Sequence, residues 1–469
     1  MKVLLMTPPL PDPDWMYGGF RGSTLWEVSD PPLGLAYIAA VLEKAGHEVK
    51  IFDCAVEKMQ IDDFKLPGND FDLIGITCVT MNYPQVKELV NRIKGQGDFK
   101  TIIGGPHPTS IPMESFRYCN SDYLAVGEGE NTMLELADTL EKGKSVKDVK
   151  GILFREGDKI VGTEPRPLIE NLDELPFPAR HLLDLKKYKP EIEKNIKQPA
   201  TNMITSRGCP YRCIFCCRNI FGNAFRAHSA QYVLNEIKFL QDKHSIKDII
   251  FFDDTFSVDN QRVIDICDGI IKDKMDIIWN CSARVNTVTR DLIFKMAEAG
   301  CYQIAFGVES GSQRVLNLIK KGIIKEQVER AVKWTKEADM EARCYFMLGI
   351  PGETIEEMRE TVNFAKKLNP DVVHFSIATP FPATEMSDIA SKLTKGTWDD
   401  YCAGRNTDIT NINLSTMTRE QLNEFTSMAY KEFYLRPSFM LSRVSRLRNY
   451  WYFKRYMEAF KAIVKRYVI

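Results

Sequence analysis

Three cysteines within eight residues are the strongest chemical feature of this sequence. Cys209, Cys213 and Cys216 follow a short apolar segment and stand in a loop with Gly208 and Pro210. A cluster of four irons and four sulfides normally takes one thiolate for each iron. Three thiolates therefore leave one iron open to an outside ligand, and an open iron makes such a cluster reactive. The spacing predicts a catalytic 4Fe-4S cluster bound by these three cysteines.

Zinc is the main alternative metal for this loop. A structural zinc site takes four Cys or His ligands, usually arranged as nearby pairs. Cys217 adjoins Cys216 and cannot easily turn toward the same metal, and the next Cys or His along the chain is His228. The spacing therefore favours the iron–sulfur cluster, with Cys217 outside the ligand set. The remaining cysteines stand singly, which is typical of small buried side chains.

The bulk composition is that of an ordinary globular protein. A length of 469 residues favours two or three domains, because a single core rarely grows past about 250 residues. Lys and Arg number 62 against 63 Asp and Glu, so net charge gives no reason to expect a nucleic-acid partner. The apolar run after Met1 is too short for a signal peptide, and no window holds the roughly 18 apolar residues of a membrane span. We expect a cytoplasmic protein whose thiols stay reduced.

Two blocks of alternating strands and helices are expected to position these residues. In the first block, residues 1–150, apolar runs predict strands at 3–6, 49–52, 73–77, 101–103 and 123–126. Helical patterns lie between them, so this block predicts an α/β fold, a Rossmann-like parallel sheet with helices on both faces. Ligands of such sheets bind beyond the carboxyl ends of the strands.

A hairpin is expected at residues 151–162, with its turn at Glu156-Gly157-Asp158, and a proline-rich linker follows to residue 199. The alternation resumes over residues 200–385, where strands are predicted at 203–205, 249–252, 277–281, 303–308, 342–348 and 372–377. Six such units predict a partial (β/α)6 TIM barrel with its site at the carboxyl rim. Residues 386–469 are mostly helical in pattern.

The cysteine loop resembles the signature loop of the radical S-adenosylmethionine (SAM) superfamily, because the cysteines are spaced three-then-two and Phe215 precedes the last of them. In that family the open iron binds SAM, and an electron from the cluster splits SAM into methionine and a 5′-deoxyadenosyl radical. The radical then abstracts hydrogen from an unactivated carbon. The resemblance extends over residues 203–382 and implies a core of this type.

The same resemblance implies SAM contacts at the ends of later strands. Asp253 and Asp254 match the segment that lines the methionine end of SAM, and Glu309 and Ser310 match the motif that reaches its ribose and amino group. Gly349 lies in a turn similar to the one near the adenine. Arg284 is a weaker candidate for the SAM carboxylate. The alternatives are that the two aspartates cap the next helix and that Gly349 and Gly352 serve only the turn.

The first block resembles the cobalamin-binding domain that precedes the radical SAM core in one large class. The resemblance lies in Pro31 to Leu35, the loop from Gly104 to Thr109, and Gly127-Glu128-Gly129-Glu130. Glycines at strand ends let a backbone approach a flat ring or a nucleotide tail closely. The implied cofactor contacts are Pro8, Met81, Asn82, Gly104, Gly105, His107, Gly127 and Glu128.

One departure from that domain concerns the metal's axial ligand. Mutases and methionine synthase place an axial His in an Asp-x-His-x-x-Gly motif, whereas this chain has Ala55 at the matching position after Asp53. Radical SAM relatives commonly lack this His and bind cobalamin with a free lower face. A Rossmann-like domain that binds substrate or stands empty is the alternative. His107 either contacts the cofactor's tail or makes local hydrogen bonds in its turn.

The C-terminal segment is basic and aromatic. Nine Lys or Arg residues stand between Leu435 and Ile469 against Glu458 alone, and apolar residues repeat at helical spacing. Such a helix either packs on the barrel or lies on an anionic membrane surface. The segment from Phe433 to Pro437 resembles the subgroup of the anaerobic magnesium-protoporphyrin monomethyl ester cyclases, which implies a tetrapyrrole or lipid substrate.

These features together predict a cobalamin-dependent radical SAM enzyme that methylates an unactivated carbon of a small-molecule, tetrapyrrole or lipid substrate. An external electron donor such as flavodoxin or ferredoxin is implied, and no nucleic acid. A radical cyclase or oxidoreductase of the magnesium-protoporphyrin ester type is the nearest alternative. A non-enzymatic cobalamin or iron–sulfur carrier is the alternative from another class.

Changing Cys209, Cys213 and Cys216 together to alanine should abolish iron binding. Anaerobic reconstitution should load about four irons per chain into the parent protein, as measured by metal analysis. The Cys217→Ser variant is the matched control, because this cysteine adjoins the ligands without joining them, and it should keep the full iron load. Full iron retention in the triple variant, or stoichiometric zinc in the parent, would contradict the prediction.

Overall fold

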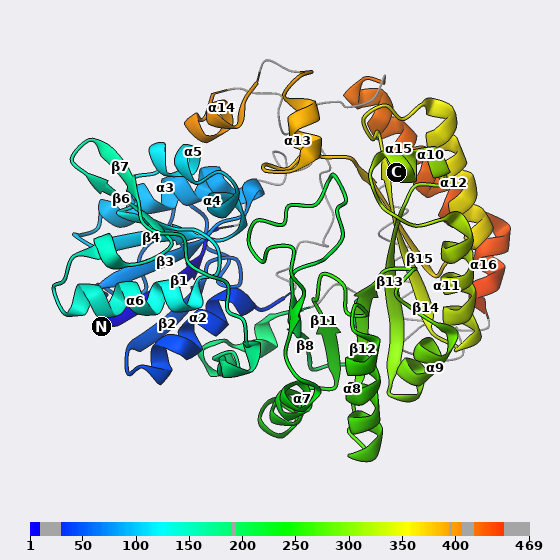
Figure 1. Cartoon of the computed structure of the whole chain (residues 1–469), viewed down its shortest axis with the longest axis horizontal. Helices are drawn as coiled ribbons and strands as arrows, with labels where there is room; N and C mark the ends of the chain where they lie inside the picture. The colour runs from blue at the N-terminus through cyan, green and yellow to red at the C-terminus, as the bar shows by residue number, and fades with distance from the viewer. Residues whose placement is uncertain (10–29, 190–193, 394–395, 406–416, 445–469) are drawn as a thin grey trace.

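The computed structural model describes residues 1–9, 30–189, 194–393, 396–405 and 417–444. Two sheets, each with its own helices, make up the architecture (Figure 1). The α/β fold class predicted from the sequence is therefore confirmed. The predicted contact of the basic C-terminal helix with a membrane falls largely on residues 445–469, which lie outside the described part of the chain.

The first sheet has seven strands in the order β2-β1-β3-β4-β5-β6-β7. They are β1 (Lys2–Thr7), β2 (Glu48–Asp53), β3 (Leu73–Thr77), β4 (Lys100–Gly104), β5 (Tyr123–Ala125), β6 (Ile152–Glu156) and β7 (Lys159–Gly162). The first five are parallel, and the hairpin β6–β7 adds to β5 antiparallel. The predicted hairpin thus extends the first sheet.

Helices cover both faces of this sheet. Along β1, Val3 and Leu5 face α2 (Leu33–Lys44) and α6 (Glu130–Glu141), whereas Leu4 and Met6 face the other side. That other side packs against α3 (Tyr83–Lys94), α4 (Pro106–Ser110) and α5 (Pro112–Arg117). Because a strand points alternate side chains to opposite faces, its uninterrupted apolar run is explained by burial on both sides.

The second sheet has six parallel strands in the order β15-β14-β13-β12-β11-β8. They are β8 (Ala200–Met203), β11 (Asp248–Phe251), β12 (Ile278–Ala283), β13 (Cys301–Glu309), β14 (Glu341–Leu348) and β15 (Val372–Ile377). The sheet curves without closing, since β8 and β15 each pair on one side only. This is the predicted partial barrel, although β8 begins and ends earlier than predicted and β13 is longer.

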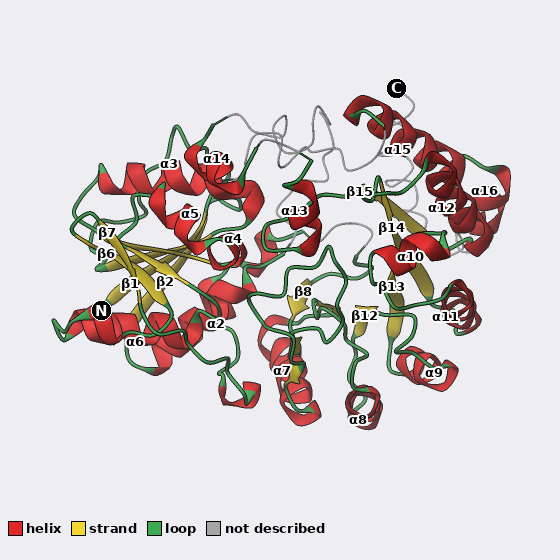
Figure 2. Ribbon diagram, turned by 45° about the horizontal axis from the view of Figure 1, so that its top comes forward, coloured by secondary structure: helices red, strands yellow, loops and turns green. Residues whose placement is uncertain are grey.

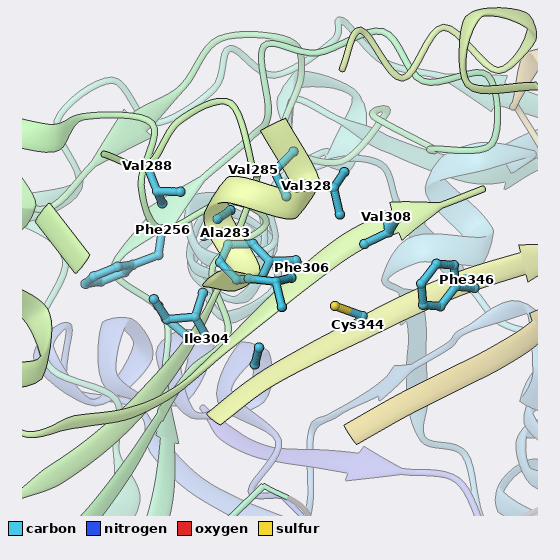
Figure 3. Close-up of a cluster of buried hydrophobic side chains, with 14 of the residues drawn as sticks. Phe256, Ala283, Val285, Val288, Ile304, Phe306, Val308, Val328, Cys344 and Phe346 are labelled. Carbon is cyan, nitrogen blue, oxygen red and sulfur yellow. The ribbon is translucent and has the colours of Figure 1, made fainter. Parts of the chain in front are cut away.

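Helices line the outside of the second sheet, as Figure 2 shows. They are α7 (Ala230–His244), α8 (Asn260–Lys272), α9 (Arg290–Glu298), α10 (Gln313–Leu318), α11 (Lys325–Glu337), α12 (Ile355–Leu368), α15 (Arg419–Tyr434) and α16 (Pro437–Val444). Alternate residues of β13 and β14, such as Phe306 and Phe346, gather in the core with Val328 of α11 (Figure 3). The residues between them on β13, namely Gln303, Ala305, Gly307 and Glu309, point to the opposite face of the sheet.

Side-chain caps fix where the barrel helices begin. The side chains of Ser229, Asp259, Thr289, Ser312 and Thr354 each accept a hydrogen bond from the backbone N–H three residues later. Such caps satisfy N–H groups that have no partner inside the helix. Asp259 begins α8, so Asp253 and Asp254 do not cap that helix.

A segment after β15 joins the two sheets. It contains α13 (Glu385–Ala390) and α14 (Trp398–Ala403), and α14 packs against α5 of the first sheet. The Arg117 guanidinium and the Tyr118 hydroxyl both donate to Asp399, at 2.6 and 2.8 Å. Tyr401 donates to the backbone oxygen of Thr80 at 2.5 Å. Among the described helices, none is both long and apolar enough to cross a membrane.

Candidate functional site

The cysteine loop is closed at its base by a two-stranded ladder. β9 (Ser206–Arg207) pairs antiparallel with β10 (Arg226–Ala227), a pairing that no local pattern in the sequence predicts. Gly208 has a φ of +84°, and a Cβ there would meet the Ala224 carbonyl oxygen at 2.3 Å. Only glycine fits this position, because the loop closes on itself there.

Asp253, at the end of β11, ties the start of this loop to the sheet. Its carboxylate accepts hydrogen bonds from the Thr205 N–H, the Thr205 hydroxyl and the Ser206 hydroxyl, each at 2.6 Å. Asp253 is 3 % exposed. The Asp253 carboxylate is therefore engaged by hydrogen bonds from the start of the cysteine loop. The neighbouring Asp254 is exposed.

The three cysteines differ in their surroundings. The Cys209 sulfur lies 3.8 Å from the Thr255 hydroxyl, Cys213 is buried, and Cys216 is exposed. The Arg284 guanidinium lies 3.5 Å from the Cys213 sulfur and stacks on the Tyr211 ring at 3.6 Å. Arg284 is thus held against the cysteine loop.

Positive charge and hydrogen bonding favour a thiolate at Cys213. A hydrogen bond from Cys216 lowers the pKa of Cys213, and the nearby Lys321 and Arg284 cations lower it further against the effect of burial. The thiolate is the form that binds metal. This environment suits a metal-binding cysteine better than an inert core thiol.

The sulfurs of Cys209, Cys213 and Cys216 do not all lie within 4.8 Å of one another. Four sulfurs that bind one zinc at about 2.3 Å lie about 3.8 Å apart. Among the described residues, the group of three candidate ligands within 4.8 Å of one another is His47, Asp138 and Glu141, not the cysteines. The three cysteines alone therefore do not have the spacing of a preformed single-metal site.

Glu309 adopts a strained backbone beside this loop. Its φ is +69°, and the β13–β14 pairing shifts register between Gly307 and Glu309. The carboxylate accepts a hydrogen bond from the Lys321 ammonium at 2.7 Å, and both side chains are buried. A Cβ at Gly307 would come within 2.5 Å of Glu309 and 2.8 Å of Lys321, so this glycine makes room for the ion pair.

Sequence reasoning missed Lys321. Its ammonium lies 5.7 Å from the centroid of the Phe215 ring, which places it between the cysteine loop and Glu309. Its backbone oxygen also accepts a hydrogen bond from Arg284. A lysine that follows a short helix carries no local signal, because its role depends on contacts between separate strand ends.

Ser310 and Gly349 are each positioned by contacts with nearby residues. The Ser310 hydroxyl lies 3.1 Å from the Thr361 hydroxyl and accepts from the Ser312 N–H. Gly349 has a φ of +76°, and a Cβ there would meet Leu422 of α15 at 2.6 Å. Both residues lie at the carboxyl rim, where the sequence predicted them.

Glu353 is a buried acid in the turn after β14. It accepts hydrogen bonds from the Gly349 and Ile350 N–H groups at 2.8 and 3.0 Å. Burial raises the pKa of Glu353 to about 7, even though these two donors act in the opposite direction. The turn therefore contains a carboxyl that titrates near neutral pH.

A cavity of about 260 Å³ lies at the carboxyl edge of the first sheet. Its lining includes the predicted Gly104, Gly105, Gly127 and Glu128. Gly34 and Gly127 also line it, and a Cβ at either would meet no atom within 4 Å. These glycines keep open the space that a flat, elongated group such as a cofactor tail needs.

The second half of the chain contributes to the same cavity. Tyr37 and Glu130 of the first sheet's helices line it together with Ile204 and Arg207, which precede the cysteines, and Phe221, which follows them. Sequence reasoning missed this sharing, because residues far apart in sequence meet there.

The other predicted contacts of the first sheet lie differently. Pro8 is buried at the end of β1, and Met81 and Asn82 are half-buried in the turn after β3, where the Asn82 side chain accepts from the Val79 N–H. His107 is fully buried, 3.2 Å from the Thr80 hydroxyl and 3.6 Å from the Cys402 sulfur. Burial lowers the pKa of His107 to about 3, so the ring is neutral. Each ring nitrogen of His107 already has a polar neighbour, Thr80 at one and Cys402 at the other.

A second cavity, of about 470 Å³, lies between the two halves. Cys213 and Cys216 line one side, and Thr109 and Val126 of the first sheet line the other. The remaining lining residues are mostly polar, namely Arg212, Ile214, Arg218, Asn219, Gly222, Asn223, Ala383 and Glu385. The cysteine loop and the first sheet therefore face a common space.

Comparison with known proteins gives two family matches. Residues 203–365 match the radical SAM superfamily, and residues 29–137 match the B12 binding domain. An uncharacterized methyltransferase of Pyrococcus horikoshii is 37% identical over 95% of both chains. The cytidylyl-2-hydroxyethylphosphonate methyltransferase of Streptomyces wedmorensis is 30% identical over 76% of this chain and 77% of its own.

More distant relatives extend the comparison. The anaerobic magnesium-protoporphyrin IX monomethyl ester cyclase of Rubrivivax gelatinosus is 27% identical over 94% of this chain and 78% of its own. Among solved structures, the cobalamin-dependent SAM radical enzyme OxsB has a TM-score of 0.73 at 18% identity, covering 98% of this chain and 72% of that one. TsrM from Kitasatospora setae has a TM-score of 0.68 at 19% identity, covering 83% and 76%. These two structures share the fold.

Replacing Glu353 with glutamine should make the stability of the protein depend less on pH. The native pKa of Glu353, about 7, lies above that of an unfolded carboxyl, so folding is favoured at acid pH and this contribution is lost as pH rises through 7. Thermal unfolding midpoints at pH 6 and pH 8 measure the difference. The drop between them should be smaller in Glu353→Gln than in the parent.

The exposed Glu356, in the first turn of α12, provides the matched control. Glu356→Gln should keep the parent's drop in midpoint between the two pH values. An equal drop in Glu353→Gln and the parent would show that this carboxyl does not titrate differently in the native state.

Proposed function

The chain belongs to the cobalamin-dependent radical SAM enzymes, and we propose that it methylates an unactivated carbon of a small-molecule, tetrapyrrole or lipid-like substrate. Its cofactors are a 4Fe-4S cluster, SAM and cobalamin. When bound, the cluster supplies the electron that cleaves SAM, and cobalamin supplies a methyl group. An external one-electron donor such as flavodoxin or ferredoxin completes the proposal.

The observation that carries this proposal is the cavity shared by the two halves. Cys213 and Cys216 stand on one side of it, and Thr109 and Val126, beside the glycine loops of the first sheet, stand on the other. A substrate held there would lie between the cysteines that would hold the cluster and the part of the first sheet that would hold cobalamin. A catalyst gains most from holding reacting groups in one place.

The roles of the chain's own residues follow from their contacts. Cys209, Cys213 and Cys216 would hold the cluster, with Phe215 packed beside them and Lys321 supplying positive charge. Glu309 stands at the strand end where SAM's polar groups are expected, already oriented by its ion pair with Lys321. Its strained backbone supports a site role, because such strain persists only where the surroundings enforce it.

Three groups at the barrel rim would help to place SAM. Arg284 would act mainly by fixing the cysteine loop, since its guanidinium contacts Cys213 and the Lys321 backbone. Gly349 lets the turn after β14 pass close to α15, and Ser310 holds the start of α10. Asp254, exposed after β11, would face SAM, whereas Asp253 anchors the loop.

In the first sheet, the backbone of Gly104, Gly105 and Gly127 would lie against the cobalamin tail. Met81 and Asn82, half-buried in the turn after the central strand, would also lie against cobalamin. His107 would act through the turn that it packs against, because Thr80 and Cys402 occupy its nitrogens.

A cyclase or oxidoreductase outcome is the second candidate. It is favoured by the likeness to the Rubrivivax gelatinosus cyclase over 94% of this chain. The methyltransferase relative is more similar, at 37% identity against 27%, and this difference favours methylation.

An isotope experiment separates these outcomes. The reconstituted chain with hydroxocobalamin, a chemical reductant and SAM bearing a CD3 group is incubated anaerobically with extract of a strain that lacks the gene. Methylation predicts a product carrying the intact CD3 group, formed together with S-adenosylhomocysteine and 5′-deoxyadenosine. The matched controls are the triple cysteine-to-alanine variant, which should form none of these, and Cys217→Ser, which should form all.

Other results would contradict methylation. Formation of 5′-deoxyadenosine without S-adenosylhomocysteine, and with an unlabelled product, would support the cyclase or oxidoreductase outcome. Absence of both nucleosides with extract from every growth condition, in a chain that carries cluster and cobalamin, would support a carrier.

A further inference from the structure

Two arginines at the base of the cysteine loop meet two glutamates of the first sheet. Arg207 donates to Glu128 at 2.8 Å and to Glu130 at 2.5 Å. Arg226, the partner of Arg207 across the β9–β10 ladder, donates to the two Glu128 oxygens at 3.0 and 3.1 Å. Both strands that close the cysteine loop are thereby fixed to the loop between β5 and α6.

The linker between the two halves joins this network. The Ile169 N–H donates to Glu128 at 2.7 Å, and the Ile169 carbonyl accepts from Arg226 at 2.5 Å. Arg226 also donates to the Phe221 carbonyl, inside the cysteine loop, at 3.1 Å. Glu128 is the centre of the network, since it accepts from the ladder and from the linker.

The network is buried and electrically balanced. The side chains of its four charged members are between 2 and 9 % exposed. Two guanidinium groups face two carboxylates, so removal of one member leaves a charge in a poorly solvated place. The network therefore ties the base of the cysteine loop to the first sheet through buried, paired charges.

The same residues form a wall of the first sheet's cavity. Glu128, Glu130 and Arg207 line it, and the cysteine loop adds Ile220 and Phe221. The Arg207 guanidinium lies 5.5 Å from the ring centroids of both Tyr37 and Phe221. A group bound in this cavity thus touches the residues that hold the base of the cysteine loop.

We propose that this network couples occupancy of the cofactor cavity to binding of the iron–sulfur cluster, with Glu128 as the positioning residue. Arg207 stands two residues before Cys209, so ordering the loop around a cluster orders the cavity wall. The inference rests on the proposed binding of cobalamin and cluster, and it adds that each stabilises the other. Such coupling is reciprocal: cluster tightens cobalamin binding by the same factor by which cobalamin tightens cluster binding.

Equilibrium dialysis against hydroxocobalamin, with cobalt determined by mass spectrometry, tests the coupling without any turnover. The dissociation constant is measured for the cluster-loaded chain and for the chain stripped of iron by an anaerobic chelator. We expect cobalamin to bind about ten-fold more tightly to the cluster-loaded form. As the reciprocal test, saturating cobalamin should slow the loss of iron to the chelator.

The Glu128→Gln variant should reduce the ratio of the two dissociation constants to near one. The Glu130→Gln variant, which removes one contact of Arg207, should reduce the ratio partly and serves where Glu128→Gln does not fold. A residue that merely supports the fold would weaken cobalamin binding equally in both forms and leave the ratio unchanged.

Glu135→Gln is the matched control. Glu135 stands on α6 and forms an ion pair with Arg166 of the linker, just as Glu128 forms one with Arg226. Unlike the Glu128 pair, the Glu135 pair does not include a residue of the strands that close the cysteine loop. This variant should keep the parent's ratio. A parent ratio of one, or an unchanged ratio in folded Glu128→Gln, would overturn the coupling. Absence of cobalamin binding in both parent forms would instead overturn the proposed function.

Discussion

The three hydrogen bonds that Thr205 and Ser206 donate to Asp253 hold the cysteine loop at the carboxyl edge of the barrel. Because the acceptor is a buried carboxylate at the end of β11, the start of the loop cannot shift without leaving a charge unsatisfied. The β9–β10 ladder then closes the loop, and Gly208 permits the tight return. The positions of Cys213 beside Arg284, and of Arg207 beside Glu128, both depend on this anchor.

The sheets were predictable because their signal is local. Apolar runs separated by helical patterns predicted every strand of both sheets within a few residues, and the turn residues of 151–162 predicted the hairpin β6–β7. The β9–β10 ladder was missed, because two-residue strands carry no periodic pattern. The docking of α14 on α5 was also missed, since Asp399 and Arg117 are nearly three hundred residues apart in sequence.

The locations of site residues were predictable where one strand end carries a whole motif. They were less predictable where the site depends on contacts between elements far apart in sequence. The cysteine loop, Glu309 and the glycine loops of the first sheet lie at the expected carboxyl edges. Lys321 was missed, because only the fold brings it to Glu309. Asp253 and His107 look like ligands in sequence, yet in the fold their polar atoms are engaged by neighbouring side chains. A motif indicates which residues come together at the site. The hydrogen bonds in the fold determine which of those residues still have polar atoms available to contact a ligand.

Low-temperature electron paramagnetic resonance shows whether the cluster proposed for the cysteine loop has one iron open to SAM. The reduced, reconstituted chain should give the signal of a 4Fe-4S cluster, and addition of SAM should shift its g values because the open iron gains a new ligand. S-Adenosylhomocysteine, which lacks the sulfonium methyl group, serves for comparison. Identical spectra with and without excess SAM, in a chain that holds a full complement of iron, would show that no iron of the cluster is open to SAM.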